Sequence, residues 1–280
     1  MRSVLITGAS TGIGRAAALL MDSKGWHVVA GVRREEDGEA LAGAGSGRIE
    51  PLLLDVTDAE QVAEAASRIA ERVGPAGLDG LVNNAGIVVG GAVEAVPVEE
   101  LRSVLETNVI GQFAVTRSLL PSLRAAGGRI VFIGSINGRL SLPFLSPYSA
   151  SKHAIEAIGD SLRGEMRPFG VKVSIIEPGA IDTPMREKGR VAGSESKKQL
   201  SGDHLLLYGK AIDGFMRAAA KGDRAASPPE RVATVIEHAL TASRPRTRYL
   251  VGTDARAQAL LASLLPDRLR DRLIAFLMRG

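Results

Sequence analysis

The chain has 280 residues, a net charge of +4 at pH 7, 45% hydrophobic residues and no cysteine. This length and composition can bury a sizeable α/β core, and the lack of cysteine excludes disulfide bonds, thiolate metal sites and a cysteine nucleophile. No apolar run reaches the roughly 18 residues that a membrane-spanning helix needs, and the lack of cysteine is compatible with a reducing compartment, so we expect a cytoplasmic protein. The four histidines lack metal-ligand spacing, so we expect no metal site. The net charge is too small to indicate binding of nucleic acid.

Seven short apolar runs predict the strands of a sheet. They are residues 3–7, 27–32, 49–56, 78–84, 129–134, 172–178 and 248–252. Four longer stretches between them have helical spacing, namely residues 13–25, 58–74, 98–123 and 149–166. The strands are continuously apolar, which is typical of strands covered on both faces. The alternation predicts an α/β fold with one doubly wound domain, in which helices flank both faces of a seven-stranded parallel sheet.

The stretch TGASTGIG (7–14) joins the first predicted strand to the first predicted helix. Glycines at such a junction permit a tight turn and a close approach of the backbone to a pyrophosphate at the helix N-terminus. The alternative is a turn that needs glycine for its shape alone. We predict a dinucleotide site here, and its residues are Gly8, Ser10, Thr11, Gly12, Ile13 and Gly14.

The second predicted strand ends in GVRR (31–34). In dinucleotide folds an acidic residue near this point binds the adenine ribose, whereas an arginine accommodates a 2′-phosphate. Val32 occupies the acidic position, and Arg33 and Arg34 follow it. This pattern favours NADP(H) over NAD(H), although two solvated arginines would look the same.

The ends of the next two strands carry further candidates. Asp55 and Val56 follow the third strand, where the Asp55 carboxylate would accept a hydrogen bond from the adenine amino group or else cap the next helix. NNAG (83–86) ends the fourth strand, and its asparagines are suited to tying strand ends together. We predict cofactor contacts by Asn84, Ala85 and Gly86.

The stretch YSASK (148–152) places Tyr148 one helical turn before Lys152. An ammonium near a phenol stabilises the phenolate, so we expect Lys152 to lower the pKa of Tyr148. Ser135 follows the fifth strand and would hydrogen-bond a carbonyl oxygen beside the tyrosine. Asn108, within a predicted helix and followed by Gly111, indicates a local bend with free carbonyls that would hold a water.

These motifs together resemble the short-chain dehydrogenase/reductase superfamily in its common single-domain form, and the retinol and hydroxysteroid dehydrogenase branch in particular. The match runs in order from Thr7 to Thr183. The resemblance implies a Rossmann-type domain and a catalytic tetrad of Asn108, Ser135, Tyr148 and Lys152. It also implies that Tyr148 and Lys152 contact the cofactor and that Pro178, Gly179, Ile181 and Thr183 surround the nicotinamide. Many NADP-preferring members have a basic residue where this chain has Thr11, so the preference rests on Arg33.

The expected function is an NADP(H)-dependent oxidoreductase that interconverts an alcohol and its ketone or aldehyde. Residues 186–229 interrupt the domain 1–255, and we predict that this insertion is a substrate lid; the alternative is an ordinary surface loop. The insertion begins with a polar stretch but also contains apolar residues, which would suit an apolar substrate. These residues are Leu205, Leu206, Leu207, Tyr208, Phe215 and Met216, and packing of the lid on the body would explain them equally well. A non-catalytic NADP-binding redox sensor is the rival function. Relatives are usually homodimers or homotetramers, so we expect a homo-oligomer.

Residues 256–280 form a predicted amphipathic, basic extension. Residues 241–280 hold eight Arg, three Asp and no Lys, a net charge of +5. Pro266 is expected to divide the segment into two short helices. We expect this segment to pack on its own domain. The next alternative is contact with a partner subunit or with the mouth of the substrate site, and contact with a membrane is the last.

Overall fold

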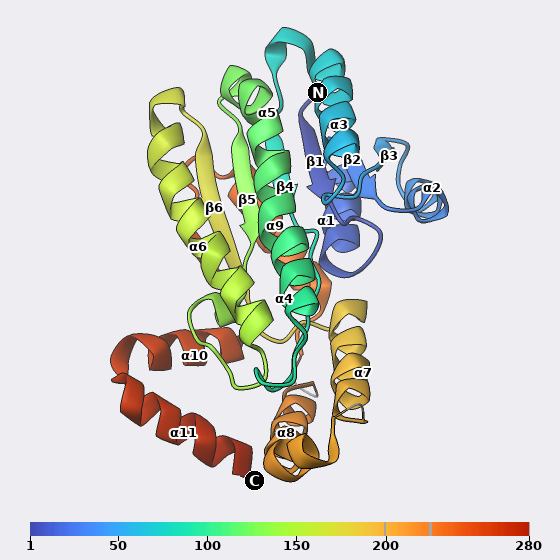
Figure 1. Ribbon diagram of the computed structural model, residues 1–280. Coiled ribbons are helices and arrows are strands. Elements are labelled where there is room, and N and C mark those ends of the chain that lie inside the picture. The colour runs from blue at the N-terminus through green and yellow to red at the C-terminus, as the bar shows by residue number, and fades with distance from the viewer. Residues whose placement is uncertain (199, 224–225, 280) are drawn as a thin grey trace.

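The computed structural model describes residues 1–198, 200–223 and 226–279. Its seven strands form one parallel sheet in the order β3-β2-β1-β4-β5-β6-β7 (Figure 1). The strands are β1 (Ser3–Thr7), β2 (His27–Val32), β3 (Ile49–Leu53), β4 (Gly80–Asn83), β5 (Arg129–Ile133), β6 (Lys172–Pro178) and β7 (Arg248–Val251). The predicted doubly wound, seven-stranded fold is therefore confirmed.

The helices are α1 (Gly12–Ser23), α2 (Glu35–Gly43), α3 (Ala59–Val73), α4 (Val98–Leu105), α5 (Gln112–Ala126), α6 (Ser146–Met166), α7 (Pro184–Lys198), α8 (Gly202–Asp223), α9 (Pro229–Thr241), α10 (Thr253–Leu264) and α11 (Asp267–Arg279). Short 3-10 turns lie at Gly74–Ala76, Ile136–Gly138 and Arg167–Phe169. The single helix predicted over 98–123 is wrong in one respect, because a π-helical turn, Glu106–Gly111, separates α4 from α5. α2, α7 and α9 are additional to the predicted helices, since the sequence indicated only a polar stretch where α7 lies.

Alternate residues of strands β1 to β6 pack into two separate cores. In β1, Val4 and Ile6 join the core beneath α1 and α9, whereas Leu5 joins the core beneath α3, α5 and α6. Figure 1 shows α3, α5 and α6 in front of the sheet and α9 behind it. Full burial of each such side chain contributes roughly 1.5–3 kcal/mol, which explains why the strands are apolar on both faces.

The strand order reverses at β1, which lies between β2 and β4. Open α/β sheets bind ligands outside the carboxyl ends of the strands at such a switch point. The chain leaves this edge after β6 to form α7 and α8, and α11 returns to pack on α8 (Figure 1). The insertion and the C-terminal segment therefore lie at the ligand-binding end of the sheet.

The C-terminal segment is divided as predicted, since α10 ends before Pro266 and α11 starts after it. None of the helices in the described part of the chain is long and apolar enough to cross a membrane.

Candidate active site

The glycine turn between β1 and α1 packs too closely for side chains. Gly8 and Gly12 have φ angles of +62° and +53°, and a Cβ on Gly14 would lie 2.3 Å from the Gly8 oxygen and 2.5 Å from Nδ2 of Asn84. Thr11 is the N-cap residue of α1, but its side chain caps no backbone group. Within the described residues no hydrogen bond occupies the N–H groups of Gly12, Ile13 and Gly14. The first turn of α1 thus fits a pyrophosphate, both in shape and in its unpaired donors.

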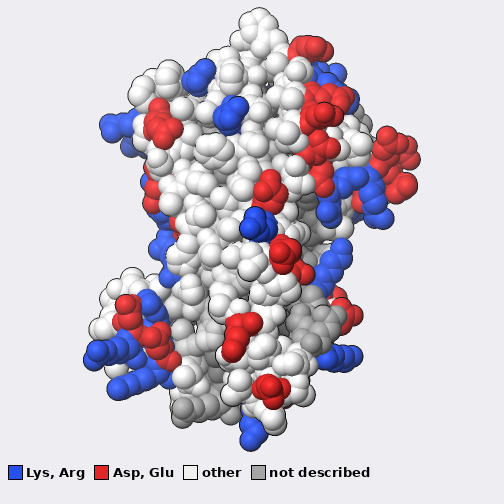
Figure 2. Space-filling view, viewed as in Figure 1, with Lys and Arg blue, Asp and Glu red and all other residues white. Residues whose placement is uncertain are grey.

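Arg33 and Arg34 follow β2 and are both exposed. Arg34 donates two hydrogen bonds to Asp37, from Nε at 2.9 Å and from a terminal nitrogen at 2.8 Å. The hydrogen bond from Arg34 holds the pKa of Asp37 below its usual value, and the charges of Arg34, Arg33 and Lys188 act in the same direction. Arg33 forms no hydrogen bond or ion pair with any residue that the structure describes. Figure 2 shows the resulting mixture of basic and acidic atoms at the α2 corner. Of the two arginines, Arg33 is the one left open to a ligand.

The ends of β3 and β4 are fixed by side-chain hydrogen bonds. Asp55 accepts from the backbone N–H and hydroxyl of Thr57, whereas Asp58 is the cap of α3, so the alternative that Asp55 caps this helix is wrong. Nδ2 of Asn84 donates to the backbone oxygens of Thr7 and Gly8, both at 2.9 Å. These bonds tie the end of β4 to the glycine turn, as predicted.

Thr7 is a residue of this network whose role the sequence analysis missed. Its hydroxyl accepts from the backbone N–H groups of Asn84 and Ala85, each at 3.0 Å. The adjacent Gly86 faces Asn108, whose Oδ1 would lie 3.1 Å from a Cβ at Gly86. The NNAG turn is therefore held between the glycine turn and Asn108.

Asn108 lies fully buried inside the π-helical turn. Its Oδ1 accepts from the backbone N–H of Ile87 at 2.8 Å, and its Nδ2 donates to the Ile87 oxygen at 2.9 Å and to the Ser151 hydroxyl at 3.0 Å. The predicted bend is present, since a π-helical turn breaks the regular pattern of helical hydrogen bonds. Because the side-chain amide is fully engaged, a water at this site would bind a backbone carbonyl.

Ser135, Tyr148 and Lys152 converge beyond the end of β5. Nζ of Lys152 lies 5.6 Å from the centre of the Tyr148 ring and donates to the Ile133 oxygen at 2.8 Å. The Ser135 hydroxyl accepts from the backbone N–H of Asn137 at 3.1 Å and is close enough to Tyr148 to influence the pKa of its phenol by hydrogen bonding. The structure thus brings the predicted catalytic side chains together.

The prediction that Lys152 lowers the pKa of Tyr148 is wrong in this arrangement. Burial raises the pKa of the Tyr148 phenol above its usual value, and only the hydrogen bond with Ser135 acts in the opposite direction. Burial also lowers the pKa of Lys152 to about 8, against the attraction of Glu156. At neutral pH Tyr148 therefore keeps its proton while most Lys152 is charged.

The turn after β6 crosses the glycine turn. Its Thr183 side chain would lie 3.0 Å from a Cβ on Gly12. Ile181 forms a parallel bridge with Ser227 in which the backbone of Ser227 bonds to Ala180 and Asp182. The N–H and C=O of Ile181 itself have no such partner among the described residues, so they fit a carboxamide, as the resemblance implies.

Asp254, at the start of α10, supports this turn and was missed from the sequence. Its Oδ2 accepts from the Ala180 N–H at 2.7 Å, and a Cβ on Gly179 would lie 2.1 Å from the same oxygen. Gly179 is therefore required for close contact with the Asp254 carboxylate. No short-range sequence signal joins residues 179 and 254.

A family model described as short chain dehydrogenase matches residues 2–192. The chain belongs to the short-chain dehydrogenase family. Retinol dehydrogenase 5 of Mus musculus is 39% identical over 98% of this chain and 88% of the relative. The 17-beta-hydroxysteroid dehydrogenase type 6 of Bos taurus is 40% identical over 97% of this chain and 87% of the relative. This short-chain dehydrogenase is thus an oxidoreductase of the retinol and hydroxysteroid dehydrogenase branch.

Solved structures agree with the fold. A short-chain dehydrogenase from Streptomyces avermitilis has a TM-score of 0.79 and 32% identity, covering 97% of this chain and 94% of that chain. One from Burkholderia cenocepacia, in complex with NADP, has a TM-score of 0.73 and 27% identity, covering 98% of this chain and 99% of that chain. The family supports a nicotinamide cofactor, which the free donors at α1 fit.

This short-chain dehydrogenase has a cavity of about 890 Å³ at the end of the molecule that carries the insertion. The cavity lies between the loop before α6, α8 and α11. It is lined by Ser141, Leu142, Pro143, Phe144, Lys210, Ala211, Asp213, Arg217, Asp271, Ile274 and Ala275. Phe144, the last lining residue of this loop, precedes Tyr148 by four residues, which makes the cavity a candidate for the substrate site.

The apolar residues of the insertion do not act as one group. The Phe215 ring meets the Phe144 ring edge-to-face at 5.9 Å, which supports the cavity wall. Leu206 and Leu207 are exposed, so packing of the lid on the body does not account for them. Tyr208 instead donates to Glu94 at 2.5 Å, joining α8 to the loop after β4.

No cluster of His, Asp or Glu able to hold a metal ion occurs within the residues that the structure describes.

Proposed function

We propose that this protein is an NADP(H)-dependent short-chain dehydrogenase/reductase that interconverts an apolar alcohol and its ketone or aldehyde. One observation carries the proposal, namely the convergence of Ser135, Tyr148 and Lys152 beyond the end of β5. Asn108 supports this group through the Ser151 hydroxyl, which itself donates to the Tyr148 backbone oxygen at 2.7 Å. The four residues thus act as one constellation rather than as separate motifs.

Tyr148 is the proton donor and acceptor in this proposal. Its raised pKa keeps the phenol protonated at neutral pH, so it is ready to give its proton to a carbonyl oxygen during reduction. In oxidation the same oxygen receives the proton of the alcohol. The nicotinamide cofactor, when bound, supplies or accepts the hydride.

The other three residues position the reacting groups. The Ser135 hydroxyl donates to the substrate oxygen and polarises it. The charged Lys152 donates to the ribose hydroxyls of the cofactor and so positions it. Asn108 fixes the NNAG turn and the start of α6, and the nearby π-helical turn offers a backbone carbonyl to a water.

The preference for NADP(H) rests on the exposed Arg33, which is open to a 2′-phosphate. The Burkholderia cenocepacia neighbour is in complex with NADP, and ElxO, with 26% identity and a TM-score of 0.72, also has NADP bound. A tyrosine-to-phenylalanine variant of ElxO has NADPH bound. These neighbours support both the cofactor and the expectation that loss of the tyrosine leaves cofactor binding in place.

An apolar substrate is supported by the cavity and by the names of the relatives. Retinol and hydroxysteroids are bulky and mostly apolar, and the cavity of about 890 Å³ offers Leu142, Phe144 and Ile274 to such a body.

The test is the replacement Tyr148→Phe. We expect turnover to fall by roughly 10²–10⁴-fold, because the proton donor is gone, while the affinity for NADPH stays within a few-fold of wild type. Turnover with a panel of apolar ketones and NADPH binding by fluorescence would be measured on the same preparations. Full activity in the variant would refute the role of Tyr148, and NADPH binding by a wild type without any turnover would favour the redox sensor.

A further inference from the structure

A pair of buried carboxyl groups lies next to Lys152 and has no part in the proposed mechanism. Glu156 follows Lys152 by one turn of α6, and Glu177 lies near the carboxyl end of β6. The Glu177 side chain is 0% exposed and that of Glu156 is 13% exposed. Oε1 of Glu156 and Oε2 of Glu177 have no hydrogen-bond donor among the described residues. Two buried acceptors without a donor are costly, but one proton shared between them would satisfy both.

Guanidinium groups from several elements pair with the carboxyl groups of this cluster. Arg139 donates from Nε to Oε1 of Glu177 at 2.6 Å. Arg248 donates from Nε to Oε2 of Glu156 at 2.9 Å and from a terminal nitrogen to Asp160 at 2.7 Å. Arg248 also bridges the two buried carboxyl groups, because its Nε lies 3.5 Å from Oε1 of Glu177, while Arg163 pairs with Asp160. Glu156 and Glu177 therefore lie against the same guanidinium group, and each has one oxygen without a donor among the described residues.

Glu156 and Lys152 titrate in neighbouring pH ranges. Burial and the charge of Glu177 raise the pKa of Glu156 to about 7, while Arg248 acts in the opposite direction. Lys152 has a pKa of about 8, which burial lowers and Glu156 raises. The carboxyl group also fits tightly behind the site, because Oε1 of Glu156 would lie 3.2 Å from a Cβ on Gly134, the residue before Ser135.

We propose that Glu156 is a positioning residue that shares a proton with Glu177 and, once ionised, keeps Lys152 charged. This inference rests on the proposed function of Lys152. The charged groups around Glu156 are Lys152, Asp160 and the Arg163 that pairs with Asp160, all on α6, together with Glu177 on β6, Arg139 after the Ile136–Gly138 turn and Arg248 on β7.

The direction of the effect follows from the order of the two titrations. Below pH 7 Glu156 is mostly neutral, and Lys152 is charged because the pH is below its own pKa. As the pH rises through 7, Glu156 loses the shared proton and its carboxylate then attracts the ammonium group. Removal of this carboxylate should let Lys152 lose its charge at a lower pH.

Infrared difference spectroscopy of the full-length protein across pH 5 to 9 tests the shared proton without any turnover. The wild type should show a carboxyl C=O band that disappears with a midpoint near pH 7. The band should be absent from Glu156→Gln, which keeps the side-chain shape. It should titrate at lower pH in Glu177→Gln, because the neighbouring negative charge is gone. An unchanged band in Glu156→Gln would overturn the shared proton.

The pH profile of kcat/KM for ketone reduction tests the effect on Lys152. The alkaline limb of Glu156→Gln should move to lower pH by roughly one unit, as expected for loss of an opposite charge in a buried site. Glu156→Asp, which keeps the carboxylate, should restore the limb at least in part. Asp160→Asn is the matched control within the cluster. It should leave the alkaline limb of kcat/KM in place, because Glu156 is still present and is already ionised at alkaline pH.

Two outcomes separate the two proposals. An active Glu156→Gln variant whose alkaline limb matches that of the wild type would overturn the positioning role alone. A wild type without turnover on any carbonyl substrate would overturn the proposed function, and the role of Lys152 with it, whatever the infrared titration shows.

Discussion

Arg33 and Arg34 are adjacent in the chain but differ in their contacts. Arg34 is held by two hydrogen bonds to Asp37, whereas Arg33 has no hydrogen bond or ion pair with the described residues and is exposed beside the dinucleotide site. A guanidinium group that is already paired must lose that pair before it binds a phosphate. The two arginines should therefore contribute unequally to the choice between NADPH and NADH.

We expect Arg33→Ala to weaken NADPH binding by roughly tenfold and to leave NADH binding nearly unchanged, because only NADPH carries the 2′-phosphate. Arg34→Ala is the matched control and should weaken NADPH binding less. Titrations of both cofactors with each variant, at one fixed salt concentration, would measure this. Equal losses for NADPH and NADH in Arg33→Ala would mean that Arg33 does not face the ribose.

At the residue scale, sequence motifs predicted the side chains that meet but not their environment. Ser135, Tyr148 and Lys152 converge as expected, since their spacing places them at the ends of neighbouring elements. The predicted direction of the pKa shift of Tyr148 was wrong, because residue spacing reveals a nearby charge but not the burial that raises the pKa. Thr7 and Asp254 were missed, because their hydrogen bonds join segments about 75 residues apart.

At the element scale, the strands were predictable because both of their faces are buried, which leaves continuous apolar runs. α2 was not predicted, since it is short and has only two buried residues, Gly38 and Leu41. The interruption of the helix at Asn108 was predicted as a bend, but its π-helical form was not, and the Asn108 side chain within it hydrogen-bonds to Ile87 and Ser151, which are distant in the sequence.

The loop before α6 is an element whose shape the sequence did not reveal. Phe144 has a φ angle of +65°, a conformation that is unfavourable for a bulky residue. Its oxygen accepts from the Gly91 N–H at 2.8 Å, and its ring contacts Phe215 of α8. The surroundings thus hold a strained residue at the cavity wall, and α8 and α11 complete that wall.

We therefore expect Ile274→Ala, on α11, to raise KM for a bulky apolar substrate by roughly tenfold, because the cavity loses an apolar contact. NADPH binding should not change, since the cofactor residues lie elsewhere. Phe276→Ala is the matched control on the same helix, because this side chain is 72% exposed and does not line the cavity. Equal KM values for Ile274→Ala and the wild type would exclude α11 from the substrate site.

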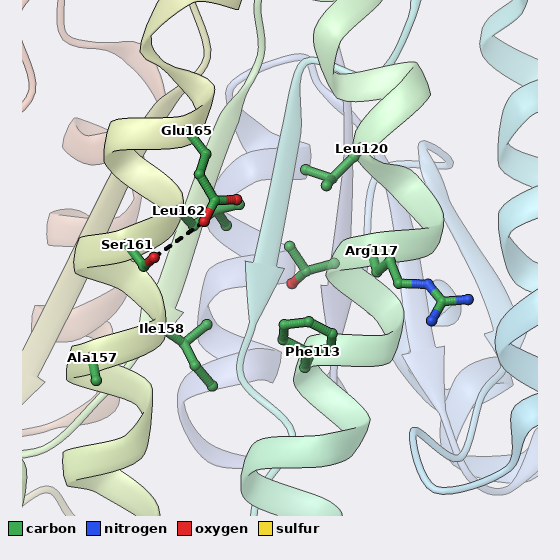
Figure 3. A pocket seen from close by; sticks show the side chains of 9 residues that line it. Phe113, Arg117, Leu120, Ala157, Ile158, Ser161, Leu162 and Glu165 are labelled. Atoms are coloured by element: carbon green, nitrogen blue, oxygen red, sulfur yellow. Dashed lines mark hydrogen bonds between the residues drawn. The ribbon is translucent and has the colours of Figure 1, made fainter.

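At the scale of the whole molecule, the face formed by α5 and α6 is poor in charge. Figure 2 shows this face as mostly uncharged, and Figure 3 shows Phe113 and Leu120 of α5 and Ile158 of α6 around a common groove. The groove has a volume of about 340 Å³, and Phe113 at its rim is 51% exposed. Arg117 and Glu165 also line the groove, and Glu165 accepts a hydrogen bond from Ser161 at 3.1 Å. A face that is poor in charge and has an exposed aromatic residue is typical of the core of a subunit interface.

We propose that two copies of the chain associate through this face, as the resemblance to oligomeric relatives leads us to expect. In a two-fold dimer the same patch is used twice, so one substitution places two charges in the interface. Phe113→Asp should therefore convert the oligomer to a monomer, measured by analytical ultracentrifugation at micromolar concentration. Phe276→Asp is the control for adding charge at an exposed phenylalanine of α11, and it should leave the oligomer intact. A monomeric wild type would exclude the interface, whereas an oligomer that survives Phe113→Asp would place it on another face.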